Sequence, residues 1–320
     1  LWERAANYAA VLIDDIGGIG GMDPKGWTWY CNTSEISGLK NGENPKEILW
    51  RGAKNQSNSL EAQNYPPSIY GNGYCNPTQN FVDCFPDAKG YPITSENTAT
   101  QPYRNRDPRL DKYVVVNGSK IGSGNTTINT SANGSNLDGL NNLSGSSTRT
   151  GYYLRKLLRN DINLNPVNPS TQLHYNAYIR YTEIFLDYAE AANEAWGPTQ
   201  TGGHAYSAYD VIKALHNRCG AGNDYLESIK DNKNLMRELI RNERRIELSF
   251  ENHRFWDLRR WKVSLDKLNE TARGISINSA DKTYTPINVD TRNYKEHMFY
   301  GPIPYGECLK FDRLQQNAAW

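Results

Sequence analysis

The sequence is poor in several features that would place it in a familiar functional class. Its 36 Lys and Arg side chains nearly balance 35 Asp and Glu side chains, so the formal charge is only +1. Proteins that bind nucleic acid usually carry a basic excess or stripe, so a polyanion is not expected as the main partner. The longest apolar stretch, residues 9–13, is far below the roughly 20 residues that cross a bilayer. The sequence therefore predicts neither nucleic-acid binding nor a membrane span.

Motifs for catalysis and metal binding are missing as well. None of the five histidines falls in H-E-x-x-H or another paired ligand spacing. No G-x-S-x-G elbow occurs, and the Gly-rich run at 17–21 lacks the strand and frame of a nucleotide-binding loop. The five cysteines form no C-x-x-C pair, which favours free thiols and leaves open one disulfide among Cys31, Cys75 and Cys84. We expect no cofactor, no metal and no catalytic constellation.

The length of the chain allows a substantial core. With 320 residues it suits one large domain or two modest ones, which would bury roughly 75% of the surface of the unfolded chain. The first residue is Leu1, and the opening segment has the pattern of a helix that is already under way. We therefore expect a fragment of a longer protein, in which the absence of a signal peptide says nothing about secretion.

Helical periodicity is confined to the start of the chain and to its second half. Apolar residues recur there at intervals of three and four, which is typical of amphipathic helices that bury one face. Gly run 17–21 and the pair Gly197-Pro198 would end two of these helices. The predicted helices cover residues 1–15, 178–196, about 206–219 and about 235–250.

The long segment between the first two predicted helices has a different composition. Residues 16–170 are rich in Gly, Asn, Pro, Ser and Tyr, and helical periodicity nearly vanishes. Short strands are expected at 47–51 and 113–116. Residues 122–150 are almost wholly Gly, Ser, Asn and Thr, so we expect a weakly ordered, mobile loop there.

One face of the last predicted helix carries a row of carboxylates. Glu243, Glu247 and Glu251 follow one another at intervals of four residues, and Arg244 and Arg254 are placed to neutralise them. A carboxylate pair could serve acid/base catalysis. The many arginines nearby would instead hold the carboxylates ionised, which suits a buried ion-pair lattice. We expect a structural role, in which Arg254→Ala would cost about 3 to 5 kcal/mol.

The aromatic, Asn-rich segment 27–74 is the best candidate for a ligand site. Tyr and Trp offer flat apolar faces that can cover the C–H faces of sugar rings, while Asn, Gln and Arg can satisfy hydroxyl groups. Alternatively, these rings only anchor long loops on the helices. Trp50 follows two apolar residues in an apparent strand and is expected in the core. The candidate stacking platforms are Trp27, Trp29, Tyr65, Tyr70 and Tyr74, and the candidate hydroxyl partners are Arg51, Asn64 and Asn72.

Three strings in the second half of the chain together resemble a known family. They read RYTEIFLDYAEAANE at 180–194, NERRIELSFE at 242–251 and RFWDLRRW at 254–261. The chain is similar in these strings to the C-terminal half of the SusD/RagB-type outer-membrane nutrient-binding proteins of Bacteroidetes. Supporting strings are PTQN at 77–80, RDPRL at 106–110 and PIP at 302–304.

The resemblance implies a mainly α fold. Tetratricopeptide-like helical hairpins would form a scaffold, and a large loop-rich subdomain with short strands would carry the ligand site. By this likeness the chain is a single SusD-like domain that lacks its N-terminal part. Its expected parts are a hairpin helix at 1–15, the loop-rich ligand-binding subdomain at 16–170, the hairpin scaffold at 171–272 and a C-terminal segment at 273–320.

The resemblance also implies a function. Members of the family are surface lipoproteins that sit on a SusC-like TonB-dependent transporter and capture glycans or, in some cases, peptides. We therefore expect a non-enzymatic glycan-binding protein at the outer-membrane surface, with its lipid anchor in the missing part. The alternatives are a peptide-binding member of the family, a glycoside hydrolase with carboxylates scattered in the sequence, and a scaffold that binds a protein. The family's binding aromatics follow no fixed motif, so the resemblance indicates only a region.

Overall fold

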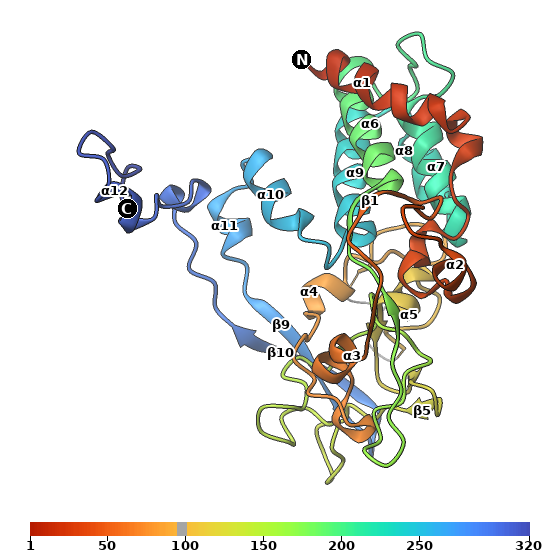
Figure 1. Cartoon of the computed structure of the whole chain (residues 1–320), viewed down its shortest axis with the longest axis vertical. Helices are drawn as coiled ribbons and strands as arrows, with labels where there is room; N and C mark the ends of the chain where they lie inside the picture. The colour runs from red at the N-terminus through yellow and green to blue at the C-terminus, as the bar shows by residue number, and fades with distance from the viewer. Residues whose placement is uncertain (95–100) are drawn as a thin grey trace.

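The computed structural model describes residues 1–94 and 101–320, and its longer helices gather at one end of the molecule (Figure 1). Helix α1 packs along α6, and α6 also packs against α7 and α9. None of the helices described is both long and apolar enough to cross a bilayer. The bounds of these helices are α1 (Trp2–Asp15), α6 (Tyr181–Trp196), α7 (Ala208–Cys219), α8 (Asp224–Ile229) and α9 (Lys233–Glu247).

Small side chains explain why α1 and α6 pack closely. Ala6 and Ala10 of α1 and Ala189 and Ala192 of α6 are all buried in one hydrophobic cluster. Since Ala adds no bulk beyond its methyl group, the two backbones can approach each other with little side-chain entropy lost. Buried residues from α7, α8 and α9 complete the cluster, so the scaffold has a single apolar core.

The four predicted helices are confirmed, with one correction at a boundary. Helix α7 begins with a capping box, in which the Ser207 hydroxyl accepts from the N–H of Asp210, and ends at Gly220 in the left-handed region. Helix α6 begins at Tyr181, whereas the periodicity placed its start at Tyr178. Residue 178 lies in a strand that leads directly into the helix.

The loop-rich part contains small antiparallel sheets of two strands each. The pairs are β1 with β8, β2 with β7, β3 with β6, and β4 with β5. Three of these pairs join residues near 50 and 115 to residues beyond 150. They therefore hold the beginning and the end of the loop-rich part together. The strands are β1 (Ile48–Arg51), β2 (Asn55–Ser57), β3 (Val114–Val115), β4 (Lys120–Ile121), β5 (Thr126–Thr127), β6 (Tyr153–Leu154), β7 (Gln172–His174) and β8 (Ala177–Arg180).

Short helical turns connect these strands. They confirm the expectation of a loop-rich region with little periodicity, and the strands expected near 47–51 and 113–116 are present as β1 and β3. The turns are η1 (Gly18–Gly21), η2 (Gly26–Cys31), α2 (Thr33–Gly38), α3 (Ser59–Asn64), η3 (Pro67–Ile69), α4 (Gln79–Val82) and α5 (Arg109–Tyr113).

Residues 122–150 form a loop, as expected, but the loop is packed rather than loose. Ile128 and Thr148 are fully buried. The Thr148 hydroxyl accepts from the backbone N–H groups of residues 150, 151 and 152 at 3.0 to 3.1 Å, and it donates to the Tyr152 carbonyl at 2.7 Å. Hydroxyl groups and the buried Ile128 thus supply internal contacts, and the expected mobility of this loop stays a prediction.

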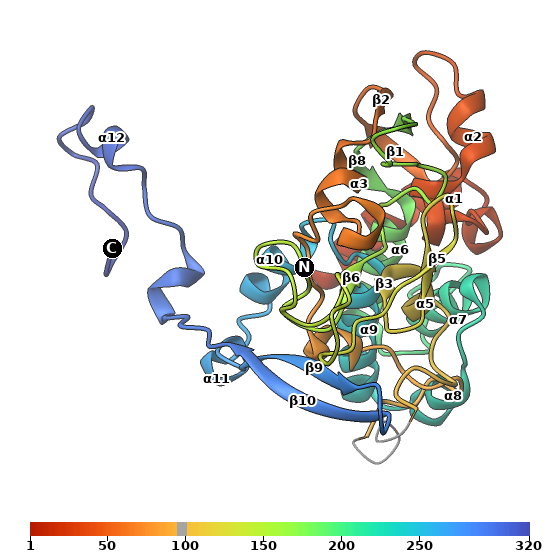
Figure 2. The same cartoon turned by 90° about the horizontal axis from the view of Figure 1, so that it is seen from below.

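The chain ends in a hairpin and an extended segment. Figures 1 and 2 both show the segment after β10 running away from the helical body. The hairpin is anchored by Ile275, which is buried and whose N–H donates to the Thr150 carbonyl at 2.8 Å. All five cysteines of the chain are unpaired. The elements are α10 (His253–Arg260), α11 (Leu265–Leu268), β9 (Ala272–Asn278), β10 (Thr283–Asp290), η5 (Glu296–Phe299) and α12 (Tyr305–Cys308).

Candidate functional site

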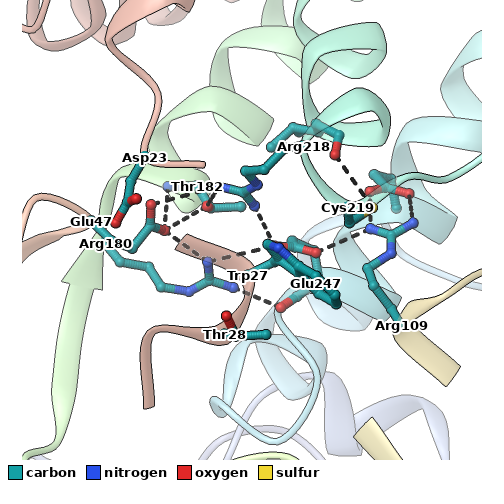
Figure 3. A network of polar contacts seen from close by, with 12 residues as sticks. Asp23, Trp27, Thr28, Glu47, Arg109, Arg180, Thr182, Arg218, Cys219 and Glu247 are labelled. Atoms are coloured by element: carbon teal, nitrogen blue, oxygen red, sulfur yellow. Dashed lines mark hydrogen bonds and ion pairs between the residues drawn. The ribbon is translucent and has the colours of Figure 1, made fainter. Parts of the chain in front are cut away.

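A buried network of ion pairs joins α9 to β8, α7 and the residue before β1 (Figure 3). Arg180 donates to Glu47 at 2.9 Å and to Glu251 at 2.7 Å. Arg218 of α7 pairs with Glu247. All of these side chains are at most 8% exposed. The network therefore ties together elements that lie far apart in the sequence.

The same network keeps its carboxylates ionised. Arg109 pairs with Glu243 and, at 3.0 Å, with Glu247, while Lys156 donates to Glu251 at 2.7 Å. Burial alone would raise the pKa of Glu247, but the surrounding arginines outweigh it and hold that pKa at about 2. A carboxyl group that stays ionised cannot act as a general acid near neutral pH. The predicted ion-pair lattice is confirmed, and its role is structural.

Its cationic partners differ from those predicted. Arg244 turns to the other side of α9, where it binds Asp257 at 3.0 Å and also Asp187. Arg254 has no hydrogen bond or ion pair with any residue in the described ranges 1–94 and 101–320. Burial and the neighbouring Arg245 lower the pKa of Arg254 to about 10. The expected 3 to 5 kcal/mol cost of Arg254→Ala is therefore wrong, because no buried carboxylate would be stranded.

One carboxyl group does have a pKa suited to proton transfer. Burial and the nearby Asp187 raise the pKa of Glu183 to about 7, and His253 Nδ1 lies 3.5 Å from its Oε1. Neither Glu183 nor His253 lines any of the cavities described below. Within the described part of the chain no group of three or more His, Cys, Asp or Glu side chains could hold a metal ion.

Several of the predicted ligand residues are buried and contact other parts of the chain. Tyr65 donates its hydroxyl to the Arg159 carbonyl. Asn64 donates to the Leu60 carbonyl at 2.9 Å and accepts from a backbone N–H at 3.2 Å. Trp27 is half-buried against a hydrophobic cluster of the core. The structure therefore gives these three residues packing roles within the chain.

Other predicted residues are exposed on a different surface. Tyr70, Tyr74 and Asn72 are all exposed. Tyr74 borders a hollow of about 380 Å³ whose lining also includes Asn76 and Arg149. The structure brings these residues near one another but does not join them to Trp29, whose surroundings are described next.

Trp29 borders a cavity of about 300 Å³ that Tyr175, Asn176 and Tyr178 also line. The Trp29 and Tyr175 rings lie 5.3 Å apart between centroids. The indole N–H of Trp29 and the hydroxyl of Tyr175 are buried and have no hydrogen-bond partner among the residues described. Buried polar groups in folded proteins nearly always have partners. Two free groups at one cavity indicate a place for a hydrogen-bonding ligand or for ordered water.

An exposed aromatic pair adjoins this cavity. Trp50 of β1 and Tyr178 of β8 are 60% and 53% exposed, and their ring centroids are 4.9 Å apart. The antiparallel register that pairs Trp50 with Ile179 brings the two rings together. The expectation that Trp50 is core is therefore wrong: its alternate position on β1 faces solvent. Arg51 is half-buried, with its guanidinium 5.6 Å from the Tyr175 ring.

His174 links the same cavity to α3. Its Nε2 lies 3.0 Å from a carboxylate oxygen of Glu61, and its Nδ1 lies 2.9 Å from the Gln172 carbonyl oxygen. Burial would lower the pKa of His174, but the hydrogen bond to Glu61 and its charge raise it above the ordinary value. The acceptors at both ring nitrogens favour the protonated ring, and the contact with Glu61 joins β7 to α3.

Sequence reasoning missed Tyr175, Asn176 and Tyr178. They lie more than 100 residues after the segment that was considered, and Tyr178 was assigned to a helix. A signal was nevertheless present. The string HYNAY at 174–178 combines rings with an amide directly before a long helix, which is the same composition that marked 27–74.

Comparison with known proteins decides the family. A profile of the SusD family matches residues 45–320, which is most of the chain. The chain belongs to the SusD family. No curated protein matches this SusD-family chain, so the other comparisons are with solved structures.

Three solved structures are similar to this chain over most of its length. A SusD-like protein from Bacteroides fragilis aligns with a TM-score of 0.69 and 24% identity over 89% of this chain and 57% of that structure. A SusD-like carbohydrate binding protein from the same species aligns with a TM-score of 0.62 and 22% identity over 82% and 53%. Surface glycan-binding protein A from Bacteroides fluxus aligns with a TM-score of 0.56 and 19% identity over 100% and 58%. The expected helix-rich SusD-like fold is confirmed, and this SusD-family chain spans little more than half the length of these relatives.

Proposed function

We propose that this SusD-family chain is part of a non-catalytic cell-surface protein that captures glycans. Two of the solved structures that share its fold are described as carbohydrate-binding or glycan-binding proteins. The observation that carries the proposal is the exposed pair of Trp50 and Tyr178 rings beside a cavity whose lining residues include two with a polar group that has no partner among the residues described.

This arrangement suits a sugar better than a purely apolar ligand. The tilted ring faces can cover the C–H faces of one or two sugar rings. The Trp29 indole N–H donates a hydrogen bond, and the Tyr175 hydroxyl can donate or accept one, so each suits a sugar hydroxyl group. Asn176 lines the same cavity and offers an amide. We therefore place the glycan site across the cavity and the aromatic pair, and keep Tyr70, Tyr74 and Asn72 as a second candidate surface.

The remaining parts of the proposal rest on the family resemblance. We infer that the whole protein sits at the outer-membrane surface through a lipid anchor and passes its glycan to a SusC-like TonB-dependent transporter. The division into a ligand-binding subdomain at 16–170 and a hairpin scaffold at 171–272 belongs to the same proposal. In this proposal the two parts share one site, because Tyr175 and Tyr178 lie beyond residue 170 and belong to the scaffold part.

A glycan-array screen followed by incubation with the labelled ligands tests this function. We expect at least one oligosaccharide to bind with a Kd between about 1 mM and 1 µM, or about −4 to −8 kcal/mol, because a capture protein must release its cargo. The oligosaccharide should be recovered uncleaved.

Three outcomes would contradict the proposal. Cleavage of the bound oligosaccharide would favour a glycoside hydrolase. Binding of peptides alone would favour a peptide-binding member of the family. Failure to bind any sugar or peptide would favour a scaffold for protein contacts.

A further inference from the structure

A second and larger cavity lies beside α10 and α11, away from the aromatic pair. Its volume is about 810 Å³, and the segment after β10 forms one of its sides. Figure 1 shows α10 and α11 next to this segment. Aromatic side chains form much of the wall, among them Phe255, Tyr294 and Trp320. We call this cavity the α10 cleft.

Positive charge is concentrated in the α10 cleft. Among the residues that the structure describes, five cationic side chains and one carboxylate line it; the carboxylate is Glu270, which pairs with Lys267 at 3.2 Å. The formal charge of +1 for the whole chain therefore conceals a local excess. The cations are Arg245, Arg254, Arg259, Lys267 and Arg292.

Arg245 and Arg254 both line the α10 cleft, and neither forms an ion pair with a residue in the described part of the chain. Arg245 donates to the Asn80 carbonyl at 3.1 Å, whereas Arg254 has no partner among the residues described. Burial and the charge of Arg245 lower the pKa of Arg254 to about 10, so it is still charged at neutral pH. An anion bound in the α10 cleft would offset the cost of holding the partly buried Arg254 charge near another cation.

The charges continue beyond the α10 cleft. An adjoining hollow of about 610 Å³ shares Arg245, Arg254 and Lys267 with it and adds Arg241 and Lys262. The guanidinium of Arg241 lies 4.9 Å from the Trp261 ring. Successive cations thus follow one another along both hollows, with aromatic rings at each of them.

We propose that the α10 cleft binds an acidic saccharide, a chain of sugar rings that carries carboxylate or sulfate groups. Guanidinium groups bind such anions through two parallel hydrogen bonds, and the aromatic walls can cover sugar rings. A strip of successive cations suits a chain with repeated charges. Apart from Phe250, the α10 cleft and the cavity at Trp29 are lined by different residues, so this site goes beyond the glycan site proposed above.

Calorimetric titration with a galacturonate hexasaccharide and with a sulfated hexasaccharide tests the proposal and distinguishes the two anions. The methyl ester of the galacturonate ligand is the neutral control. We expect at least one acidic ligand to bind, and its affinity to fall with added salt because salt screens the exposed charges. The methyl ester should bind at least tenfold more weakly, since charge-assisted hydrogen bonds would be lost.

Variants locate the site. Arg254→Gln should weaken binding about tenfold or more, and Arg254→Lys should retain part of it. Arg254→Gln should fold normally, as checked by circular dichroism, because no carboxylate loses its partner. Arg4→Gln, an exposed charge change on α1, should bind like the parent.

Several results would overturn the proposal. The proposal is wrong if neither acidic ligand binds. It is also wrong if Arg254→Gln and the parent bind with equal affinity. A hexaglutamate peptide that binds more tightly than both saccharides would show that the α10 cleft recognises acidic polypeptide instead. An equal loss of affinity in Arg4→Gln and Arg254→Gln would show a general charge effect and no site in the α10 cleft.

Discussion

Tyr65, Tyr113, Tyr152 and Tyr153 are fully buried, and each hydroxyl has a hydrogen-bond partner. A buried tyrosine needs a polar contact for its hydroxyl, and composition alone does not show where each ring lies. In a loop region without periodicity, no spacing separates a buried Tyr from an exposed one. Trp29 and Tyr65 were therefore grouped with Tyr70 and Tyr74, although the structure separates them by burial. Single residue types predict what a side chain can do, while the loop path decides whether it faces solvent.

The hydroxyl groups of two tyrosines should differ in their contribution to stability. Tyr113 donates to the Trp27 carbonyl at 2.9 Å, whereas the buried Tyr175 hydroxyl has no partner in the ranges 1–94 and 101–320. Tyr113→Phe should lower the free energy of unfolding by about 1 to 3 kcal/mol, because a buried acceptor loses its donor. Tyr175→Phe should change it by less than about 0.5 kcal/mol. Urea denaturation measures both, and equal losses would show that Tyr175 also has a partner within the chain.

The raised pKa of Glu183 predicts a pH dependence of stability. Its pKa is about 7 in the folded chain, against an ordinary value of 4.5. Between these values the folded state binds more protons than the unfolded state, so stability falls as the pH rises through this window. Glu183→Gln removes that loss. Its melting temperature should match the parent's near pH 4 and exceed it above pH 7.

Thermal melts from pH 4 to 8 check this expectation, with Glu3→Gln on the exposed face of α1 as the control. The control should follow the parent at every pH. If Glu183→Gln melts below the parent at pH 8, the carboxylate stabilises the fold and the sign of the shift is wrong.

At the level of elements, the sequence predicted the helices that have a clear apolar periodicity. Helices α1, α6, α7 and α9 each bury one apolar face, so the 3.6-residue period was sufficient to find them. The start of α6 was misplaced because an aromatic side chain in β8 fits the helical spacing by chance. The packing of residues 122–150 was missed for another reason. It depends on the Thr148 hydroxyl as well as on the buried Ile128.

The position of Arg180 between β8 and α6 predicts a large effect on stability. Arg180 is 2% exposed and binds Glu47 and Glu251. Arg180→Ala should cost about 3 to 5 kcal/mol, because it leaves buried carboxylates with fewer partners. Arg254→Ala is the matched control in the same helical region and should cost far less. Chemical denaturation of both variants checks the difference, and similar losses would mean that Arg254 also belongs to the network.

At the level of the whole molecule, the candidate glycan site is made by long-range pairing. Trp50 and Tyr178 meet because β1 pairs with β8, and no local pattern reveals which strands pair. The strings that resemble the SusD family lie instead in α6, α9 and α10, where they build the ion-pair network and the helical core. They could therefore predict the scaffold well and the ligand site only as a region.

The measurement that tests the central claim most directly is calorimetric titration of the tightest neutral glycan from the array. Each ring should contribute on the order of 1 kcal/mol. Trp50→Ala and Tyr178→Ala should therefore weaken binding several-fold each, and the double variant should nearly abolish it. Tyr8→Ala, which removes an exposed ring on α1, should bind like the parent. If the double variant binds like the parent while Tyr74→Ala does not, the glycan site lies on the surface around Tyr74 and the assignment to the β1–β8 pair is wrong.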